Sequence, residues 1–511
     1  MHDLSYLLYF VVRLKMINLK DIKLKMSFYI TTAIAYTNGN PHMGHAYEII
    51  CADIIARYQK LCQKTVYFAT GTDNHGKKIS DTAKAQNVTP LALCDHYSEV
   101  FKKLYDILGI EYDYFVRTTD ENHKTVARLV WSTMMERGDI YLGEYNGWYN
   151  VREEEFVNER EAQKCHYVDV STGKPLTKHV EPSYYFRLSQ YQKQIICHIE
   201  EHEDFIYPLE RREEILTRLK EPLNDLSISR SKESVDWGIQ IPNTEDVMYV
   251  WVDALTNYLT AIQHDTDLWP ADVQLIGKDI VWFHAVIWSG ILLSLRIPLP
   301  KTILVHGFVN GSDHRKMSKS FDNAIDPFEL LDKYNPDIIR CYLASNIGPD
   351  ICVGDSIQEF HNLVVAKFSN LVNRCLVLSS KFDHDEGFVL ELFSIVRLRE
   401  KVHANMNSYQ LKNVLDLIFE KLDVINLFIT KLKPWEKQDY SESVIKTALK
   451  AIGILSHFLD PFMPTTAQQL RNFLKIQLIP LDEISWHQKT TYNHHILFHH
   501  IGKTRIEKKL H

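Results

Sequence analysis

One local pattern near the N-terminus limits the fold of this chain more than any other. Residues 28–34 are rich in β-branched and aromatic side chains, as strands are. Pro41 can begin a helix, and residues 46–61 carry apolar side chains at helical spacing. A second apolar strand pattern follows at 65–69. A strand, a loop, a helix and a strand in this order predict the start of a parallel α/β sheet.

The same kind of pattern returns later in the chain, after an interruption. Residues 115–228 are rich in charge and break the alternation, so we interpret them as an insertion into the sheet domain. Strand-like segments then follow at 247–252, 273–276 and 303–309, and 279–295 has the pattern of a buried helix.

The last third of the chain shows a different periodicity. Apolar side chains recur at helical spacing at 360–375, 411–432 and 444–459, which predicts a helical bundle. We therefore expect a Rossmann-like α/β domain of parallel strands with a connective insertion, followed by an all-α helical bundle. The predicted boundaries are 1–25 for an N-terminal extension without an assigned function, 26–114 and 229–326 for the two halves of the α/β domain, 115–228 for the insertion, 327–360 for a linker and 361–511 for the bundle.

Composition excludes several other classes of protein. The chain has 511 residues, of which 45% are hydrophobic and 24% charged, as in ordinary globular proteins. No apolar run reaches the roughly 18 residues that a membrane span needs, so we expect no membrane partner. None of the eight cysteines forms a C-x-x-C pair. This indicates free thiols in a reducing compartment, and we expect a cytoplasmic protein.

The charge of the chain is unevenly distributed. The formal net charge is −7, whereas residues 361–511 carry 20 Lys and Arg against 15 Asp and Glu. A basic C-terminal part favours a polyanionic partner. A solvated surface explains the same numbers more simply, and from charge alone we prefer that interpretation.

The first motif with chemical potential is Pro41-His42-Met43-Gly44-His45, between the first strand and the first helix. Two histidines three residues apart on a first helical turn point the same way. The glycine between them allows a ligand to approach the backbone, and the N-terminus of a helix attracts phosphate. The simpler interpretation is a capped helix start with two surface histidines.

The second motif is Lys316-Met317-Ser318-Lys319-Ser320, about 270 residues later, in a loop after a predicted strand. Its two lysines can neutralise a triphosphate as charge develops on a leaving pyrophosphate. An isolated pentapeptide of this kind is more often a solvated basic loop.

The two motifs together resemble the pair that class I aminoacyl-tRNA synthetases use, and the chain looks like a member of the methionyl-tRNA synthetase family, from about residue 26 to its end. The stretches that carry this resemblance are A-I-A-Y-T-N-G at 33–39, G-T-D-N-H-G at 71–76, I-S-R at 228–230, V-W-V-D-A at 250–254, G-K-D-I-V-W-F-H at 277–284 and K-P-W at 433–435. Residues 71–78 are also close to a P-loop, but Lys78 stands where a P-loop needs Ser or Thr for magnesium, so we reject that reading.

The resemblance implies that the chain activates L-methionine with ATP, giving methionyl-adenylate and pyrophosphate, and then transfers the methionyl group to initiator and elongator tRNA(Met). The attacking carboxylate is already ionised, so the first step needs positioning and charge stabilisation rather than a general base. The implied catalytic residues are His42, His45, Arg230, Lys316 and Lys319. ATP, accompanied by Mg²⁺, would be bound by Gly44 and by the two histidines and two lysines.

The resemblance also implies a methionine pocket with one charged end. Asp73 would hold the α-ammonium group. The side-chain pocket would be lined by Ala33, Ile34, Tyr36, Trp251, Ala254, Tyr258, Ile280 and His284. Aromatic rings suit a thioether sulfur, and Tyr36 and His284 are expected to donate weak hydrogen bonds towards it. Without the resemblance, plain core packing would be the preferred interpretation of Trp251, Ile280 and Trp288. Leu255 and Trp288 are left open as lining residues.

The bundle would read the tRNA anticodon, and 327–360 would contact its stem. Asn370 and Arg374 lie four residues apart beside the apolar stripe, so both can face solvent. Trp435, after Pro434, can stack on a splayed anticodon base. The alternative is that Asn370 and Arg374 are surface polar residues and that Trp435 is a core residue at a helix start.

Two departures from many family members lead to further expectations. The insertion between 141 and 185 has a single cysteine, Cys165, so four zinc ligands cannot assemble there and we expect no structural zinc. The chain ends at His511 without the extra barrel by which some relatives dimerise, so we expect a monomer. The remaining alternatives are another class I synthetase, a small nucleotidyltransferase, and a non-catalytic tRNA-binding paralogue, whose two motifs would be damaged.

Overall fold

The computed structural model describes residues 27–150, 155–157, 159–170, 173–311, 325–353, 356–381, 389–436 and 438–487. The described residues form two compact units. The sheet unit comprises those within Met1–Asn40, Tyr67–Lys102 and Tyr112–Val305, and the helical unit those within Pro41–Val66, Lys103–Glu111 and His306–His511. Lys316 and Lys319, and the whole predicted extension at 1–25, lie outside the described residues.

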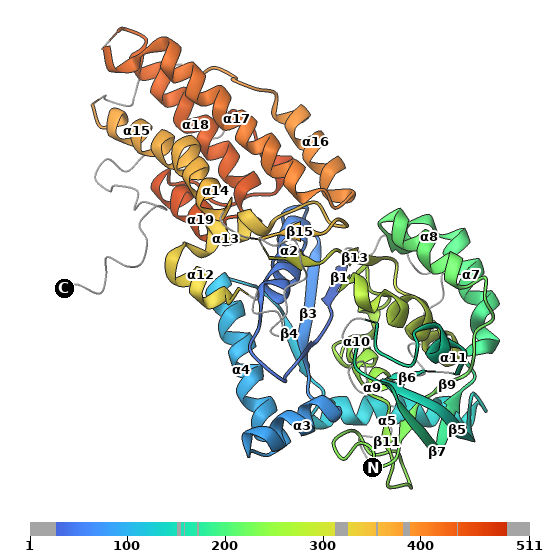
Figure 1. Ribbon diagram of the computed structural model, residues 1–511. Helices are drawn as coiled ribbons and strands as arrows, with labels where there is room; N and C mark the ends of the chain where they lie inside the picture. The colour runs from blue at the N-terminus through green and yellow to red at the C-terminus, as the bar shows by residue number, and fades with distance from the viewer. Residues whose placement is uncertain are drawn as a thin grey trace. The chain divides into compact units, whose positions relative to one another are not determined.

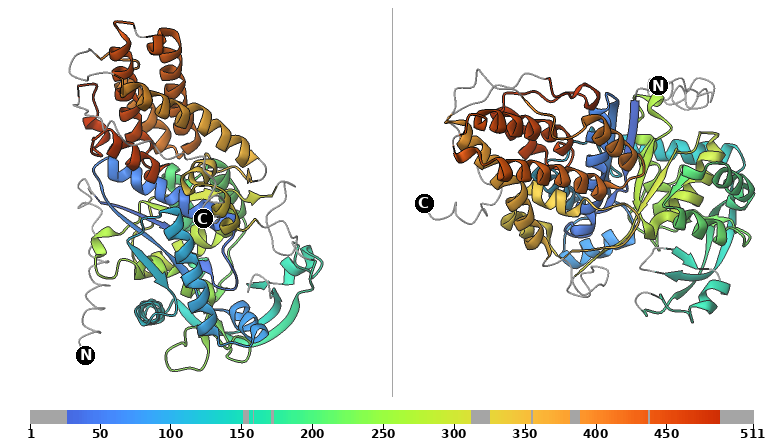
Figure 2. Two further views of the ribbon diagram at one scale, coloured as in Figure 1. Left: turned by 90° about the vertical axis from the view of Figure 1, so that its left-hand side faces the viewer. Right: turned by 90° about the horizontal axis from the view of Figure 1, so that it is seen from above.

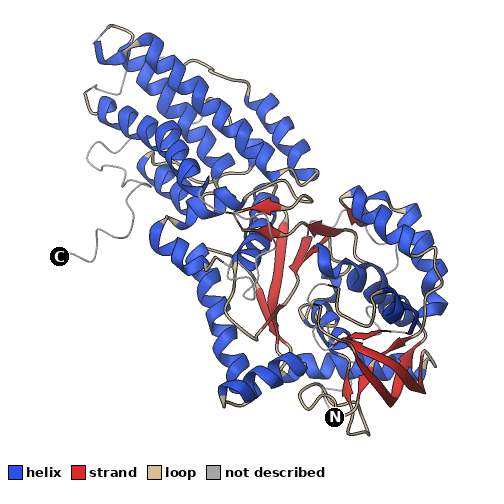
Figure 3. Cartoon of the chain, viewed as in Figure 1, coloured by secondary structure: helices blue, strands red, loops and turns tan. Residues whose placement is uncertain are grey.

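A seven-stranded sheet is the centre of the sheet unit (Figures 1 and 3). Its strands are β1 (Ser27–Thr32), β2 (Ala35–Tyr36), β3 (Thr65–Asp73), β4 (Tyr114–Arg117), β8 (Ile206–Tyr207), β12 (Val273–Gly277) and β13 (Ile303–His306). They lie in the order β2-β3-β1-β12-β13-β8, with β4 also on β3. β1 pairs with β12, β13 with β8, and β3 with both β2 and β4, all in parallel. β1 and β12 are buried almost throughout, as strands covered on both faces are. The predicted parallel α/β sheet is confirmed.

Helices and short strands complete the sheet unit. The helices are α3 (Lys77–Gln86), α4 (Pro90–Leu108), α5 (Glu121–Glu136), α9 (Val250–Leu255), α10 (Asn257–Thr260) and α11 (Ser289–Leu295), and β10 (Ser229–Arg230) pairs with β11 (Val247–Met248) in antiparallel register. The predicted helix at 279–295 is present, but it contains a wider π-helical turn at Phe283–Trp288 ahead of α11.

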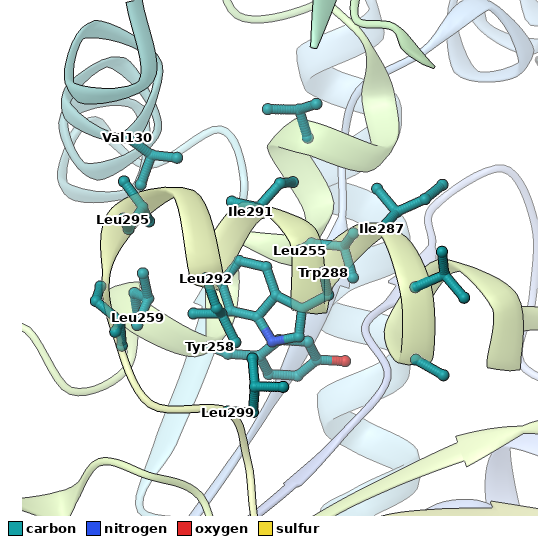
Figure 4. Packing of buried hydrophobic residues seen from close by; sticks show 14 of the residues in the cluster. Val130, Leu255, Tyr258, Leu259, Ile287, Trp288, Ile291, Leu292, Leu295 and Leu299 are labelled. Carbon is teal, nitrogen blue, oxygen red and sulfur yellow. The ribbon is translucent and has the colours of Figure 1, made fainter. Parts of the chain in front are cut away.

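The core of the sheet unit is packed around Trp288, as Figure 4 shows. Its indole is fully buried beside Tyr258, and it meets the Trp269 ring edge-on with ring centres 6.3 Å apart. Leu255 and Leu292 belong to the same cluster. Trp288 is therefore a core residue.

A second, four-stranded sheet lies within the predicted insertion. It is antiparallel in the order β6-β5-β7-β9, from β5 (Ile140–Asn150), β6 (Glu155–Val157), β7 (Thr177–Phe186) and β9 (Leu226–Ser227). Helices α6 (Glu159–Lys164), α7 (Gln192–Glu201) and α8 (Leu209–Arg218) accompany it. Most of β4 and the whole of β8 also fall between 115 and 228, yet both belong to the central sheet.

The helical unit contains the predicted bundle. Its helices are α2 (Met43–Leu61), α12 (Pro327–Lys333), α13 (Pro336–Leu343), α14 (Ser356–Val364), α15 (Asn370–Ser379), α16 (Ile395–Asn407), α17 (Leu411–Leu432), α18 (Ser441–Leu459) and α19 (Pro464–Phe473), and β14 (Val309–Asn310) pairs with β15 (Ile351–Cys352). The bundle helices, orange to red in Figure 2, run beside one another, and α18 is buried along almost its whole length. Among the helices that the structure describes, none combines the length and the hydropathy needed to cross a membrane.

Candidate active site

The two histidines of the first motif form the N-terminus of α2 and cap it. His42 is the N-cap residue, and its Nδ1 accepts a hydrogen bond of 3.0 Å from the Gly44 backbone N–H. In return, Nδ1 of His45 accepts a hydrogen bond of 3.1 Å from the His42 backbone N–H. The two rings stack with their centres 3.8 Å apart, so they point the same way, as the spacing predicts.

These hydrogen bonds fix the chemical form that each ring presents. A neutral imidazole whose Nδ1 accepts a hydrogen bond carries its proton on Nε2. His42 and His45 are thereby set up as Nε2–H donors at a helix N-terminus, an arrangement that suits a phosphate oxygen.

Gly44 is required for a reason that the sequence did not reveal. A Cβ at this position would lie 2.8 Å from Cε1 and 3.0 Å from Nδ1 of His42. The residue must therefore lack a side chain so that the His42 ring can fold back over the first turn. We predicted only that the glycine opens the backbone to a ligand.

Asp73 ends β3 in the sheet unit, beside Tyr36. The two residues are partners in the parallel β2–β3 register, at the carboxyl ends of their strands. Ligands of open parallel sheets bind at this edge. Asp73 is buried, and its Oδ1 accepts a hydrogen bond of 3.2 Å from the His75 backbone N–H. The carboxylate is thus held in place at the end of the strand.

Arg230 lies on β10 and is buried against an aromatic ring. Its guanidinium lies over the Tyr249 ring, 4.3 Å from the centre, and its Nη1 donates to the Ser229 backbone oxygen at 2.7 Å. Both side chains, together with His75 and Trp237, line a small pocket in the sheet unit. The predicted activation residue therefore borders this small pocket.

Three of the ring-bearing residues expected to line the methionine pocket, Trp251, Tyr258 and His284, form one connected group. Trp251 stacks on Phe283 with ring centres 3.8 Å apart and meets the His284 ring edge-on. The Tyr258 hydroxyl lies 2.7 Å from Nε2 of His284, and Nδ1 of His284 lies 3.0 Å from the Ile280 backbone oxygen. Ala254 is buried, whereas Ala33, Ile34 and Ile280 are half-buried.

The hydrogen bonds of His284 correct one expectation. A carbonyl oxygen can only accept, so Nδ1–H donates to Ile280 and Nε2 accepts the Tyr258 hydroxyl proton. Both ring nitrogens are engaged, and His284 has no N–H left to donate to a sulfur atom. Burial lowers the pKa of His284 to about 4, which keeps the ring neutral near pH 7.

The family described as tRNA synthetases class I (M) matches residues 28–376, more than half of the chain. The chain is a member of this family of class I tRNA synthetases. Methionine–tRNA ligase of Rhizobium meliloti (strain 1021) is 37% identical over 489 residues, which cover 89% of this chain and 92% of the relative. A crystal structure of Mycobacterium tuberculosis methionyl-tRNA synthetase bound by methionyl-adenylate is similar at TM-score 0.85 and 36% identity, covering 92% of this chain and 99% of that one.

Class I tRNA synthetases act on a large anionic substrate, and the predicted anticodon residues lie in the helical unit. Asn370 is exposed at the start of α15. Arg374, half-buried one turn later, donates from Nη2 to Oδ1 of Asn426 at 3.1 Å. Pro434 is buried, but the Trp435 side chain is 43% exposed. Trp435 is therefore not a core residue, and its ring can meet a ligand.

Sequence reasoning missed a buried cluster that holds the segment after Asp73. Nδ1 of His75 lies 2.7 Å from Oδ2 of Asp253, and Nε2 of His123 lies 2.8 Å from Oδ1 of the same carboxylate. His75 and Asp253 both lie inside stretches that carried the family resemblance, but no role was assigned to either. The sequence therefore pointed to both residues, but it did not show that their side chains are in contact.

Within the described residues, no group of three or more His, Cys, Asp or Glu side chains is placed to hold a metal ion. Cys165 lies in the insertion and donates a hydrogen bond to the Ala162 backbone oxygen. The lack of structural zinc stays a prediction. Mg²⁺ keeps several waters and is usually bound by one or two carboxylates plus substrate phosphates, so the protein would supply few of its ligands.

Proposed function

We propose that this chain is a methionine–tRNA ligase. It activates L-methionine with ATP and transfers the methionyl group to the 3′ end of tRNA(Met). The observation that carries this conclusion is the likeness, over nearly the whole chain, to a methionyl-tRNA synthetase whose structure holds methionyl-adenylate. The intact His42-x-Gly44-His45 motif supports a catalytic rather than a paralogous role.

In the activation step, a carboxylate oxygen of methionine attacks the α-phosphorus of ATP, and the bond to pyrophosphate breaks. No proton has to be removed from the nucleophile, so the protein supplies position and positive charge. We assign phosphate binding to the Nε2–H groups of His42 and His45, and stabilisation of developing charge to Arg230, Lys316 and Lys319. Mg²⁺ bound to ATP would neutralise part of the phosphate charge.

Methionine recognition is assigned to Asp73 and the connected aromatic group. The Asp73 carboxylate pairs with the α-ammonium group. Tyr36, Trp251, Tyr258 and the neutral His284 offer aromatic surfaces to the thioether, and the remaining walls are apolar: Ala33, Ile34, Ala254 and Ile280. A neutral, fully hydrogen-bonded His284 offers no charge to an ionised competitor side chain, which favours methionine over charged amino acids.

The helical bundle is assigned to the anticodon of tRNA(Met), initiator and elongator alike. Asn370 and Arg374 would bond base edges, and Trp435, held by the buried Pro434, would stack on a base. We further propose that the protein acts as a monomer in the cytoplasm and needs no structural zinc.

Amino-acid-dependent exchange between ATP and pyrophosphate, measured with all twenty amino acids and without tRNA, tests this function. We expect exchange with methionine alone, followed by charging of tRNA(Met) when tRNA is added. Exchange with a different amino acid would refute the pocket assignment but keep the family. A folded protein that binds tRNA but exchanges with no amino acid would be a non-catalytic paralogue.

A further inference from the structure

The loop that follows Asp73 is held from two sides, by the half-buried Trp237 and by a buried ion pair. On one side, Trp237 donates from its indole N–H to the Asn74 backbone oxygen at 2.6 Å, and its own backbone oxygen accepts from the Gly76 N–H at 3.0 Å. On the other side, the His75 imidazole is bonded to Asp253. These contacts hold the loop and, with it, the His75 backbone N–H that bonds the Asp73 carboxylate.

Asp253 is the residue on which this arrangement depends. Its carboxylate is completely buried, and it accepts one hydrogen bond from His75 and one from His123. His123, on α5, is held in turn by the Thr260 hydroxyl at 3.0 Å. Burial alone would raise the pKa of Asp253, but the two histidines outweigh it and hold the pKa below its ordinary value. The carboxylate is therefore ionised near pH 7.

The position of Asp253 on α9 links it to the other end of the methionine pocket. Trp251 precedes it by two residues and Ala254 follows it directly, and both are assigned to the side-chain pocket. Asp253 is thus close in the chain to two pocket walls, but its carboxylate is bonded to His75 and His123, and through His75 it holds the loop that orients the ammonium-binding carboxylate.

We propose that Asp253 is a positioning residue for methionine binding, which acts through His75 on the orientation of Asp73. Asp253 touches neither ATP nor methionine. It sets the geometry in which Asp73 meets the α-ammonium group of the substrate. The inference rests on the proposed function, because it requires that methionine is the ligand and that Asp73 binds its ammonium group.

The test compares Asp253→Asn with wild type in the full-length protein. Asn keeps the size of the side chain but cannot accept two charge-assisted hydrogen bonds on both oxygens. We expect the KM for methionine in pyrophosphate exchange to rise about tenfold or more, and the KM for ATP to stay within about twofold. Asp337→Asn is the matched control, because Asp337 is equally buried but lies on α13, where it accepts from the Thr466 N–H.

The deamino analogue of methionine, which lacks only the α-ammonium group, separates positioning from general damage. As a competitive inhibitor it should bind wild type and Asp253→Asn with inhibition constants within about twofold, because it makes no ammonium contact that could be lost. An equal loss of affinity for methionine and the analogue would overturn the proposal, since Asp253 would then act on the side-chain pocket.

A pair of substitutions at His75 tests the same proposal even if Asp253→Asn does not fold. In His75→Asn, the side-chain amide can place its N–H where Nδ1–H lies, whereas His75→Leu removes the donor. We expect His75→Asn to keep most of the methionine affinity and His75→Leu to lose about tenfold or more. Equal KM values for methionine in the two variants would overturn the proposal. If wild type itself gave no methionine-dependent exchange, the proposed function would fail, which is a distinct result.

Discussion

Arg340 on α13 and Asp53 on α2 form an ion pair of 2.6 Å in which both side chains are completely buried. Asp53 also accepts from Nε of Arg57 at 2.7 Å. Arg340 uses its remaining donors on backbone oxygens, at 2.7 Å to Pro461 and 3.2 Å to Leu108. Within the helical unit, this pair fastens the helix that begins with the two motif histidines to α13 and to the turn between α18 and α19.

Replacing Arg340 by Met should destabilise the helical unit by about 3 kcal/mol, because a buried carboxylate loses its partner and several carbonyl groups lose their donor. The measurement is urea unfolding followed by far-ultraviolet circular dichroism. Arg399→Met is the control, since Arg399 faces the exposed Asp482 at 3.5 Å and should cost less than about 1 kcal/mol. Equal losses in the two variants would show that burial of the Arg340 pair is irrelevant to stability.

Acid should weaken the same contact. Burial raises the pKa of Asp53, but the charges of Arg340 and Arg57 together lower it by a larger amount. The pKa in the folded protein therefore lies below its ordinary value. The stability that the Asp53 charge contributes is therefore complete above about pH 4 and is lost as the pH falls through the lowered pKa. Asp53→Asn lacks this contribution.

Urea midpoints of wild type and Asp53→Asn, measured between about pH 6 and pH 2, check the acid prediction. The wild-type midpoint should fall more steeply below about pH 4 than that of the variant. Burial raises the pKa values of Asp337 and Asp460 instead, but both residues are present in the two proteins, so they cancel in the difference. Parallel curves would contradict the prediction.

Gly44→Ala should reduce activation while leaving the fold intact. Its Cβ would force the His42 ring away from the first turn of α2 and disturb both capping bonds. We expect kcat for pyrophosphate exchange to fall about 100-fold, the scale of losing one donor that stabilises a transition state. Gly453→Ala is the control, because that glycine lies inside a bundle helix where a Cβ meets Ile476 at 3.2 Å. A kcat within about twofold of wild type would refute the assigned role of the His42 ring.

Trp435→Ala should weaken tRNA binding specifically. Stacking on one base contributes about 1–3 kcal/mol, so the KM for tRNA(Met) in charging should rise about 5-fold to 150-fold. Exchange without tRNA gives the reference rate against which this loss is expressed. Tyr440→Ala controls for loss of an exposed aromatic side chain, since Tyr440 is 46% exposed in the same unit. If both variants charged tRNA equally well, Trp435 would not contact the anticodon.

Local sequence patterns were sufficient for the longer elements of the central sheet and the bundle, and for the placement of the first motif. Apolar strand patterns at 28–34 and 65–69 became β1 and β3, and the motif histidines opened a helix as expected. Such patterns depend on neighbours within a few residues, which a single sequence displays.

The same local patterns could not predict contacts between residues that are far apart in the sequence. Asp253 meets His75 across 178 positions, and the bond from Tyr258 to His284 depends on a helix with a π-helical turn. The short strands β4 and β8 were missed for a related reason, because four and two residues carry too little periodicity to distinguish a sheet strand from an insertion.

The reciprocal cap at the start of α2 has a practical consequence for trapping the enzyme with its substrates. Asparagine is among the best N-cap residues, so His42→Asn can keep the helix end satisfied while removing the far nitrogen that reaches a phosphate. The variant should be folded but slow in forming the adenylate, so that its crystals can hold methionine and ATP unreacted in one complex.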